Sequence, residues 1–287
     1  MTIAICLSVN DGVVLASDSA STLSDKTGVL NVYNNADKIF NLYKGLPVGA
    51  VTWGAGSIGR SSISTLMKDL RRRFTSSSDP KWKLDKPSYE MRGIAEKVKN
   101  YFYDELYCPE FESWPEKPSL GFIVTGYSAN KTSDESYLIE INSGICSGVN
   151  PVRENHAQGI IWRGQPEAIN RLLLGHSGDF PQILSAKLGV PEDQIAVVMN
   201  IITEGLQAPL LISPMPVQDA IDLARFLVDV TINYLRFSPG APTVAGPIEI
   251  AAITKHEGFK WIQRKHYYDP ALNPRYDPSG GSDEIHK

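Results

Sequence analysis

Thr2 is the residue of this chain whose type and position point most directly to chemistry. An alcohol side chain is a poor nucleophile until a base removes its proton, and an N-terminal threonine carries such a base in its own α-amine. That amine has a pKa of roughly 7.7 to 8.0, which suits a general base near neutral pH. The amine is free only after removal of Met1, and threonine is small enough for the usual excision. The sequence therefore predicts Thr2 as a candidate nucleophile.

Other common catalytic motifs do not occur in the sequence. It contains no H-E-x-x-H, C-x-x-C, G-x-S-x-G or Walker motif, and its five histidines lack the spacing of metal ligands. A G-x-G-x-x-G match begins at Gly54, after a predicted strand and before a predicted helix. Neither a Lys-Ser/Thr pair nor a suitably spaced acidic residue completes a nucleotide-binding fingerprint there. We therefore expect no metal and no cofactor.

The first predicted hairpin determines where Thr2 lies. Residues 3–9 and 13–17 are apolar and rich in β-branched side chains, and Asn10-Asp11-Gly12 between them is a strong hairpin signal. Both runs are apolar at nearly every position, which predicts burial on both faces. A turn centred on residues 10–12 places Thr2 beside residues 19–21. We therefore expect Asp18 close to the N-terminus in space.

The remaining pattern predicts strands, then helices, then strands and helices again, and a closing hairpin. This order is typical of an α+β protein in which helices cover antiparallel sheets. The segment 195–215 is interpreted as a buried helix with its exit loop, and the chain as one domain over 1–265 with an extended or disordered tail over 266–287. The other expected elements are a strand pair within 38–56 that turns at Lys44-Gly45, a helix over 57–74 with Ser57 as N-cap, a loop over 75–87, a helix over 89–106, strands at 120–127, 136–141 and 158–164, helices at 166–174, 183–188 and 216–237, and a strand-turn-strand over 248–262.

Composition excludes several classes of partner. The net charge of −4 argues against a nucleic acid, because phosphate binding depends on clustered Lys and Arg. The dense basic run at residues 71–73 is interpreted as the end of a helix. Three scattered cysteines indicate a reducing cytoplasm rather than a disulfide framework. Neither a signal peptide nor a membrane span is expected.

Four segments together carry a resemblance to a known family. They are "TIAICLSVNDGVVLASDS", "NADKIFNL", "GAGSIG" and "GPIEIAAITKHEGFKWI". They resemble the β-subunits of the 20S proteasome, which are N-terminal nucleophile hydrolases, and within that family the bacterial Anbu branch. The ASDS that ends the hairpin, the step from Lys38 to Gly56 and the pattern over 244–249 support this. The resemblance implies a four-layer αββα sandwich and subunits that assemble into a ring or an open helical array.

The resemblance also implies roles for four residues. Thr2 matches the nucleophile, Asp18 the acidic residue, Lys38 the catalytic lysine, and the Gly56 backbone N–H the oxyanion donor. The charge of Lys38 would favour a deprotonated hydroxyl and a neutral amine, and Asp18 would hold the lysine in place.

The sequence departs from the family pattern at two places. Arg163 or Gln165 stands near the family's supporting serine. The later segment "SPGAPTVAG" lacks a carboxylate, although Thr243 offers a hydroxyl. The roles of these three residues stay unassigned.

The function expected from the resemblance is that of a threonine protease, which cleaves peptide bonds through an acyl-enzyme on Thr2. The expected partners are a peptide or unfolded protein substrate and further copies of the chain, and the need for an unfoldase stays open. Two alternatives remain, a non-catalytic structural subunit and an amidase for small non-peptide amides. The segments 75–90 and 107–119 are candidates for subunit contacts or a lid over the site.

Overall fold

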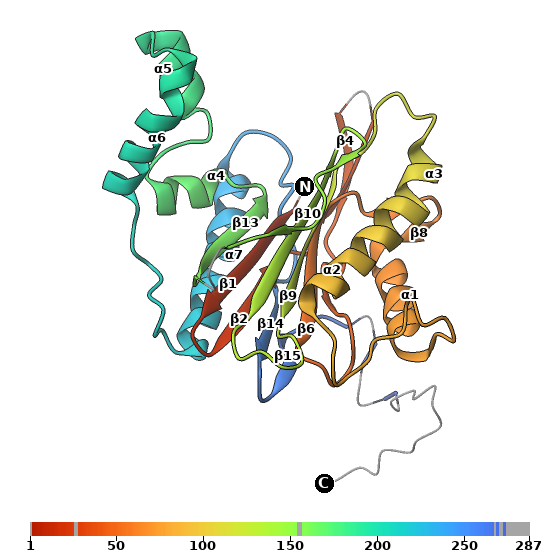
Figure 1. The fold of residues 1–287 in the computed structure, drawn as a ribbon. Coiled ribbons are helices and arrows are strands. Elements are labelled where there is room, and N and C mark those ends of the chain that lie inside the picture. Colours follow the sequence, from red (N-terminus) through yellow and green to blue (C-terminus); the bar gives the residue numbers. More distant parts are fainter. Residues whose placement is uncertain (1, 26–27, 154–156, 267, 270–271, 274–287) are drawn as a thin grey trace.

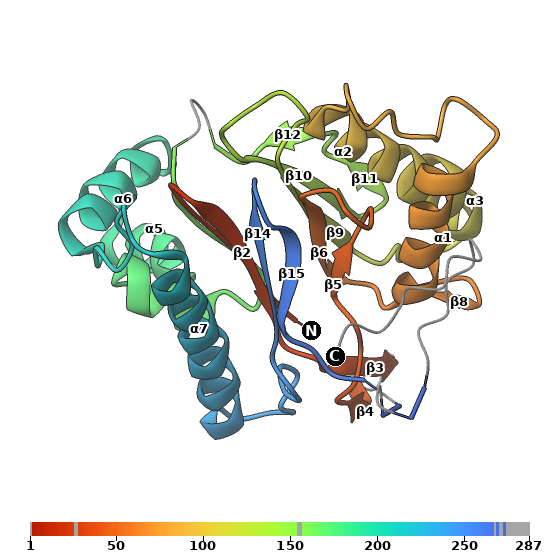
Figure 2. The ribbon, with the colours of Figure 1, turned by 90° about the horizontal axis from the view of Figure 1, so that it is seen from below.

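The computed structural model describes residues 2–25, 28–153, 157–266, 268–269 and 272–273. Two antiparallel sheets lie face to face, and helices cover their outer faces (Figures 1 and 2). The chain is thus a mixed α+β protein, as the order of predicted elements indicated. No helix in these ranges is both long and apolar enough to cross a membrane.

The first sheet carries the N-terminal hairpin at its centre. Every neighbouring pair in it is antiparallel. In spatial order its strands are β13 (Gly159–Gly164), β1 (Ile3–Val9), β2 (Gly12–Ser17), β14 (Glu249–Thr254) and β15 (Gly258–Gln263).

The second sheet faces the first and is also antiparallel. Two small hairpins lie outside both sheets, β3 (Ser21–Asp25) with β4 (Gly28–Tyr33), and β7 (Ser57–Ile58) with β8 (Ser61–Ser62). The strands of the second sheet are β11 (Ile145–Cys146), β10 (Glu135–Asn142), β9 (Leu120–Gly126), β6 (Val48–Gly54) and β5 (Ile39–Asn41), with β12 (Asn150–Pro151) paired to β10.

Each helix that covers a sheet buries one apolar face against it. On α7 (Val217–Phe237), buried side chains recur at Ala220, Ala224 and Leu227, which forms one stripe packed on β1 and β2. The short helix α4 (Glu167–Ile169) and the π-helical segment Asn170–Leu174 accompany it. The second sheet is covered by α1 (Ile63–Ser76), α2 (Met91–Lys99), the π-helical segment Asn100–Tyr107 and α3 (Cys108–Phe111).

The predicted first hairpin is confirmed in position and register. Ala4 pairs with Ser17 and Val9 with Gly12, which extrapolates to Thr2 opposite Ser19, within the predicted window. All residues of both strands are buried. One face lies in the core between the sheets and the other lies under α7.

The predicted N-cap at Ser57 is wrong. Ser57 begins β7, and the chain makes a tight turn with Gly59 at φ +57° before the helix starts. Ser62 is the N-cap of α1, and its side chain accepts a hydrogen bond from the Thr65 N–H at 3.2 Å. The glycine-rich bend therefore leads into a small hairpin, which sequence periodicity could not distinguish from a first helical turn.

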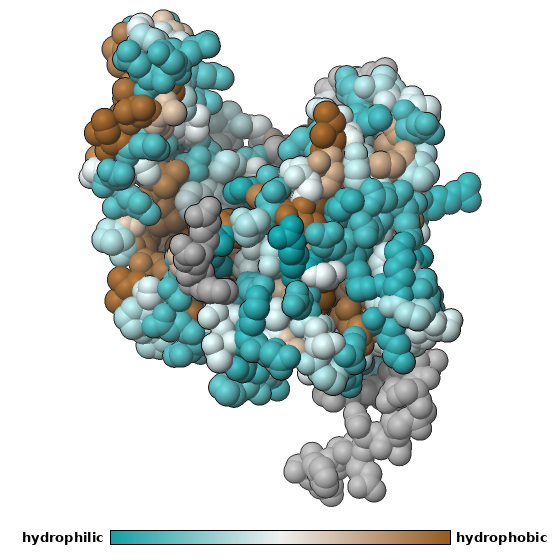
Figure 3. Space-filling view, in the orientation of Figure 1, coloured by the Kyte–Doolittle hydropathy of each residue, from teal (hydrophilic) through white to brown (hydrophobic). Residues whose placement is uncertain are grey.

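Residues 195–215 contain the expected helix and exit loop, but the expected burial is wrong. The helical part lies in α6 (Glu192–Leu206), which has no buried residue, and residues 207–215 follow it outside any helix. With α5 (Phe180–Leu188), α6 forms an arm that projects from the sheets (Figure 1). Hydrophobic side chains gather along the outer edge of this arm, next to hydrophilic ones (Figure 3).

Several boundaries also differ from those predicted. The helix expected over 89–106 continues to Phe111, because a π-helical turn joins α2 to α3. The loop expected from residue 75 begins at Ser77, and the helix expected over 183–188 starts at Phe180. The pair β3–β4 was not predicted. Most of the expected tail over 266–287 lies outside the described residues.

Candidate active site

The first sheet holds the backbone of Thr2 on both sides. The Ile3 N–H donates to Asp18 Oδ1 at 3.1 Å, and the Gln165 N–H donates to the Thr2 carbonyl at 2.8 Å. Gly164 makes this approach of β13 possible, because its φ is +96° and a Cβ there would lie 1.9 Å from the Thr2 carbonyl oxygen. Thr2 itself is buried. Its position is therefore fixed by two neighbouring strands.

Asp18 lies at the end of β2, where its side chain is completely buried. Oδ1 accepts from the Ile3 N–H and from Lys38 Nζ, at 3.1 and 2.7 Å. Oδ2 accepts from the backbone N–H groups of Ala20 and Ala245, at 2.9 and 3.2 Å. Four donors thus compensate the buried carboxylate and fix it between the N-terminus and the segment before β14.

Lys38 comes from the segment that precedes β5, and only 6% of its surface is exposed. Burial lowers its pKa below the ordinary value, while the Asp18 carboxylate acts in the opposite direction. The ion pair with Asp18 gives a buried ammonium group whose place is set by its partner.

Gly56 lies in the exposed bend between β6 and β7. Its carbonyl accepts from the Ile63 N–H at 3.0 Å, which ties the bend to the start of α1. Together with Thr2 and Lys38 it borders a cavity of ≈ 390 Å³. The structure therefore brings three of the four predicted site residues to one cavity, and places the fourth, Asp18, behind Lys38.

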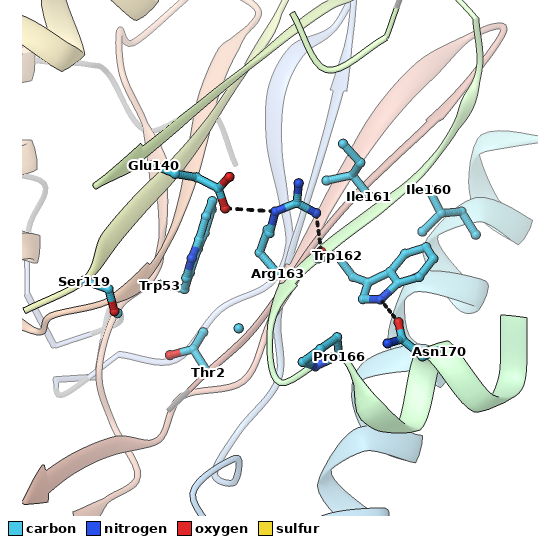
Figure 4. A pocket seen from close by; sticks show the side chains of 12 residues that line it. Thr2, Trp53, Ser119, Glu140, Ile160, Ile161, Trp162, Arg163, Pro166 and Asn170 are labelled. Atoms are coloured by element: carbon cyan, nitrogen blue, oxygen red, sulfur yellow. Dashed lines mark hydrogen bonds and ion pairs between the residues drawn. The ribbon is translucent and has the colours of Figure 1, made fainter. Parts of the chain in front are cut away.

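A second cavity, of ≈ 590 Å³, also has Thr2 in its wall. Trp53 and Arg163 lie on either side above Thr2, and Arg163 Nε donates to Glu140 Oε1 at 3.0 Å (Figure 4). On the far side, Trp162 Nε1 donates to Asn170 Oδ1 at 2.9 Å. Thr2 thus lines two cavities, one with Lys38 and Gly56 in its wall and one with Glu140, Trp162 and Arg163 in its wall.

Besides Thr2, only one side chain of the second cavity wall could be singled out from the sequence. Arg163 was recognised as a departure from the family pattern, and it lines this cavity. Trp53, Glu140 and Trp162 were missed. They come from β6, β10 and β13, so no local pattern links them.

The other two unassigned positions belong to the supports of the site. Gln165 holds the Thr2 carbonyl through its backbone N–H. Thr243 is buried, and its Oγ1 has no hydrogen-bond partner among the described residues. It lies two residues before Ala245, whose N–H contacts Asp18.

The two segments considered as lids lie mainly away from the cavities. In the segment 107–119, Ser119 alone lines a cavity that also contains Thr2. Its earlier part forms α3, where Tyr107 and Phe111 join the core of the second sheet. Residues 75–90 line neither cavity, and Trp82 and Leu84 among them pack into the same core. The buried side chains of both segments thus belong to the core of the second sheet and do not line these cavities.

Comparison with known proteins identifies the fold. No model of a protein family and no curated protein matches this chain. Among solved structures it is similar to Anbu from Yersinia bercovieri, described as an ancestral beta-subunit, with 14% identity, 93% of this chain and 89% of that chain covered, and a TM-score of 0.50. It is also similar to a Gly-1 mutant of Anbu from a Hyphomicrobium strain, with 14% identity, 92% of this chain and 86% of that chain covered, and a TM-score of 0.50. A helical assembly of the Anbu complex from Pseudomonas aeruginosa has 14% identity, with 97% of this chain and 100% of that chain covered, and a TM-score of 0.49. This chain therefore shares the fold of Anbu, a proteasome-like bacterial protein.

Proposed function

We propose that this chain is an N-terminal threonine hydrolase with the four-layer αββα sandwich of the N-terminal nucleophile hydrolases, and that it cleaves peptide bonds. The observation that carries the proposal is the shared cavity of Thr2, Lys38 and Gly56, together with the ion pair of Lys38 and the buried Asp18. A nucleophile, a fixed cation and a backbone donor are the groups that acyl transfer requires.

The first half of the reaction forms an ester. Once Met1 is removed, the neutral α-amine of Thr2 takes the proton of its own Oγ1, and Oγ1 attacks the carbonyl carbon of the scissile amide. The oxygen of the tetrahedral intermediate accepts from the Gly56 N–H, a kind of contact worth about 2.7 to 4 kcal/mol of barrier. The α-ammonium then protonates the leaving nitrogen as the C–N bond breaks.

The second half returns the enzyme to its starting state. The α-amine takes a proton from water, and the resulting hydroxide attacks the ester carbon. The ester C–O bond breaks, the acid product leaves, and the proton returns from the α-ammonium to Thr2 Oγ1. No oxidant, reductant or metal is consumed.

Lys38 and Asp18 have different electrostatic roles. Lys38, as a cation beside Thr2, favours the alkoxide and disfavours protonation of the α-amine. Asp18 compensates the buried ammonium and also accepts from the Ile3 N–H, so that it connects the lysine to the chain that carries the nucleophile. Burial strengthens both interactions.

The two cavities favour a peptide as the substrate. Both have Thr2 in their walls, so an extended chain that crosses Thr2 can place residues on either side of the scissile bond. A small amide would fill only one of them. An unfolded protein is then a substrate of the same chemistry, and an unfoldase would serve to deliver it.

We also propose that the chain works as a homo-oligomer in the cytoplasm. In the isolated chain α6 leaves Val197 and Ile201 60% and 65% exposed on one face, and an association that covers this face would remove apolar area from water. The three cysteines are free thiols, as suits a reducing compartment.

The proposal is tested with a panel of fluorogenic peptides and small acyl amides. We expect cleavage of peptides by the chain with Thr2 at its terminus, no cleavage by T2A, and partial activity in T2S. T132A removes an exposed threonine hydroxyl that lines neither cavity, and serves as a control that keeps its activity. A folded protein without hydrolysis would leave the structural-subunit alternative, and hydrolysis of small amides alone would favour the amidase.

A further inference from the structure

A second buried ion pair lies next to the segment that carries Lys38. Glu249 is the first residue of β14 and is 1% exposed, and Lys265 follows the end of β15 with 12% of its side chain exposed. Lys265 Nζ lies 2.9 Å from Glu249 Oε2. Neither residue lines a cavity that contains Thr2, so the proposed chemistry does not use them directly.

This pair contacts three consecutive residues that end at Lys38. Lys265 Nζ donates to the Ala36 carbonyl at 2.9 Å and lies 3.5 Å from Asp37 Oδ1. The backbone N–H of Lys38 faces the Glu249 carboxylate and lowers its pKa. The other peptide group of Lys38 is held by the second sheet, because its carbonyl accepts from the Thr52 N–H at 3.0 Å.

The contacts have a geometric consequence. Residues 34–38 form an irregular connection between β4 and β5 and belong to no strand. Besides the bond from Thr52, one further backbone–backbone bond among the described residues holds them, from the Ala36 N–H to the Ser19 carbonyl at 2.9 Å. A lysine side chain has several rotatable bonds, and its ammonium group is placed only as well as the backbone from which it extends. Glu249 and Lys265, which lie in and next to the first sheet, therefore contact the segment that leads into the second sheet. These contacts hold the backbone of Lys38 in place.

We propose that Lys265 and Glu249 are positioning residues, which clamp residues 36–38 and thereby hold the Lys38 ammonium group against Asp18 and beside Thr2. This inference rests on the proposed function of Thr2 and Lys38. It adds two residues that do not touch the substrate and to which the resemblance assigned no role.

The clamp also contributes charge, in two opposite directions. The groups that face Lys38 are Asp18 after β2, Glu249 on β14, Lys265 after β15 and, in the active form, the α-amine of Thr2. Lys265 lowers the pKa of Lys38, and Glu249 raises it. Removal of the lysine should therefore raise the pKa of Lys38, and removal of the glutamate charge should lower it.

A merely structural ion pair would behave differently from such a clamp. Loss of a structural pair lowers stability but leaves the protonation of Lys38 and the activity per folded molecule unchanged. The test therefore measures the pKa of Lys38 itself, from the pH dependence of its arylation by fluorodinitrobenzene, with the modified lysine identified by peptide mass. This readout does not depend on hydrolysis. If the chain lacks hydrolase activity, the proposed function is wrong, and the pKa of Lys38 still tests the clamp separately.

The variants K265M and E249Q are compared with the unchanged chain in its form beginning with Thr2. We expect the pKa of Lys38 to rise in K265M and fall in E249Q. We expect kcat to fall about 10- to 100-fold in both, as for a displaced catalytic group. K265R should restore most of kcat, since it keeps the charge and can donate to the Ala36 carbonyl.

Two further variants keep the test decisive if the buried variants fold poorly. D37N removes one partly exposed contact of Lys265 and should lower kcat by a smaller factor. K260M removes an exposed lysine from β15, the strand that precedes Lys265, and should change neither kcat nor the pKa of Lys38. Shifts of the Lys38 pKa in opposite directions, together with a lower kcat that K265R restores, support the clamp. An unchanged Lys38 pKa and unchanged kcat in folded K265M, E249Q or D37N would overturn it.

Discussion

At the scale of residues, the proposed catalysis depends on a buried cation, Lys38. Lys38 lies against a carboxylate with four donors and lines the same cavity as Thr2. Desolvation of an ammonium group is costly, and here Asp18 offsets that cost. The pair is therefore informative about function, because a lysine that served only as a surface charge would remain in water.

Removal of the Lys38 charge should abolish most of the activity. We expect K38M to lower kcat by about 10²- to 10³-fold, the usual effect of losing one preorganised electrostatic contact. K44M, at an exposed turn, is the matched control and should leave kcat unchanged. Steady-state kinetics on one peptide substrate would check both. Equal activity of K38M and K44M would remove Lys38 from the mechanism.

The pH profile should show the depressed pKa of Lys38. Activity requires a neutral α-amine and a charged lysine, so kcat/KM should rise with pH through the pKa of the amine and fall through the pKa of Lys38. Because burial lowers the latter, the alkaline fall should occur below the ordinary lysine value of 10.5. The pH dependence of kcat/KM for a neutral peptide checks this. A profile that stays flat up to that value would contradict it.

Arg163 should act on binding rather than on chemistry. Its guanidinium group lies in the wall of the larger cavity and pairs with Glu140, away from Lys38. We expect R163M to raise KM for longer peptides several-fold and to leave kcat unchanged, as for an interaction made equally in the ground state and the transition state. A short substrate that does not reach this cavity is the control. A loss confined to kcat would place Arg163 in the catalytic step instead.

At the scale of elements, three strands meet at the nucleophile. Thr2 directly precedes β1, the end of β2 leads to Asp18, and the end of β13 approaches so closely that only glycine fits at position 164. The hairpin and the sheet edge thus convert a chain terminus, which is ordinarily frayed, into a fixed group.

Replacement of Gly164 should displace this terminus. G164A puts a methyl group against the Thr2 carbonyl, whereas G189A has a similar positive φ with no atom within 4 Å of the added Cβ. We expect G189A to lower the free energy of unfolding by about 1–2 kcal/mol, the cost of a left-handed non-glycine residue, with activity retained. G164A should lower it further and abolish activity. Thermal unfolding and peptide cleavage measured together would check this, and an active G164A would refute the tight contact.

The sequence allowed the elements to be predicted where a local signal existed. Asn10-Asp11-Gly12 and two apolar runs gave the hairpin and its register, and hence the proximity of Asp18 to the N-terminus. Ser57 was misassigned because a two-residue hairpin and a helix start share the same Gly and Ser signals. The approach of Glu140 and Trp53 to Thr2 depends on how two sheets stack, which no single segment encodes.

At the scale of the whole molecule, the arm of α5 and α6 departs from the compact body. An apolar helix with no buried residue is stable only if something covers it, since most helical stability comes from packing of one face. The expectation of burial for this segment was wrong for the isolated chain. Burial in an assembly would explain both its composition and its exposure.

Charged residues on α6 should disrupt the proposed assembly. V197E and I201E place charge on the exposed face, and we expect a shift to smaller species with peptide cleavage by each subunit intact. I145E alters an isoleucine that is 74% exposed on the other sheet, and it should leave the assembly unchanged. Light scattering after size-exclusion chromatography would check this. An identical mass for the α6 variants and the unchanged chain would show that α6 is not the interface.

The central claim is that the free amine of Thr2 serves as the base for its own hydroxyl. The most direct measurement is the intact mass of the purified protein, with sequencing of its first residues. We expect a chain that begins with Thr2. An active protein that still carries Met1 would contradict it, because the nitrogen of Thr2 would then be an amide with no proton affinity near neutral pH.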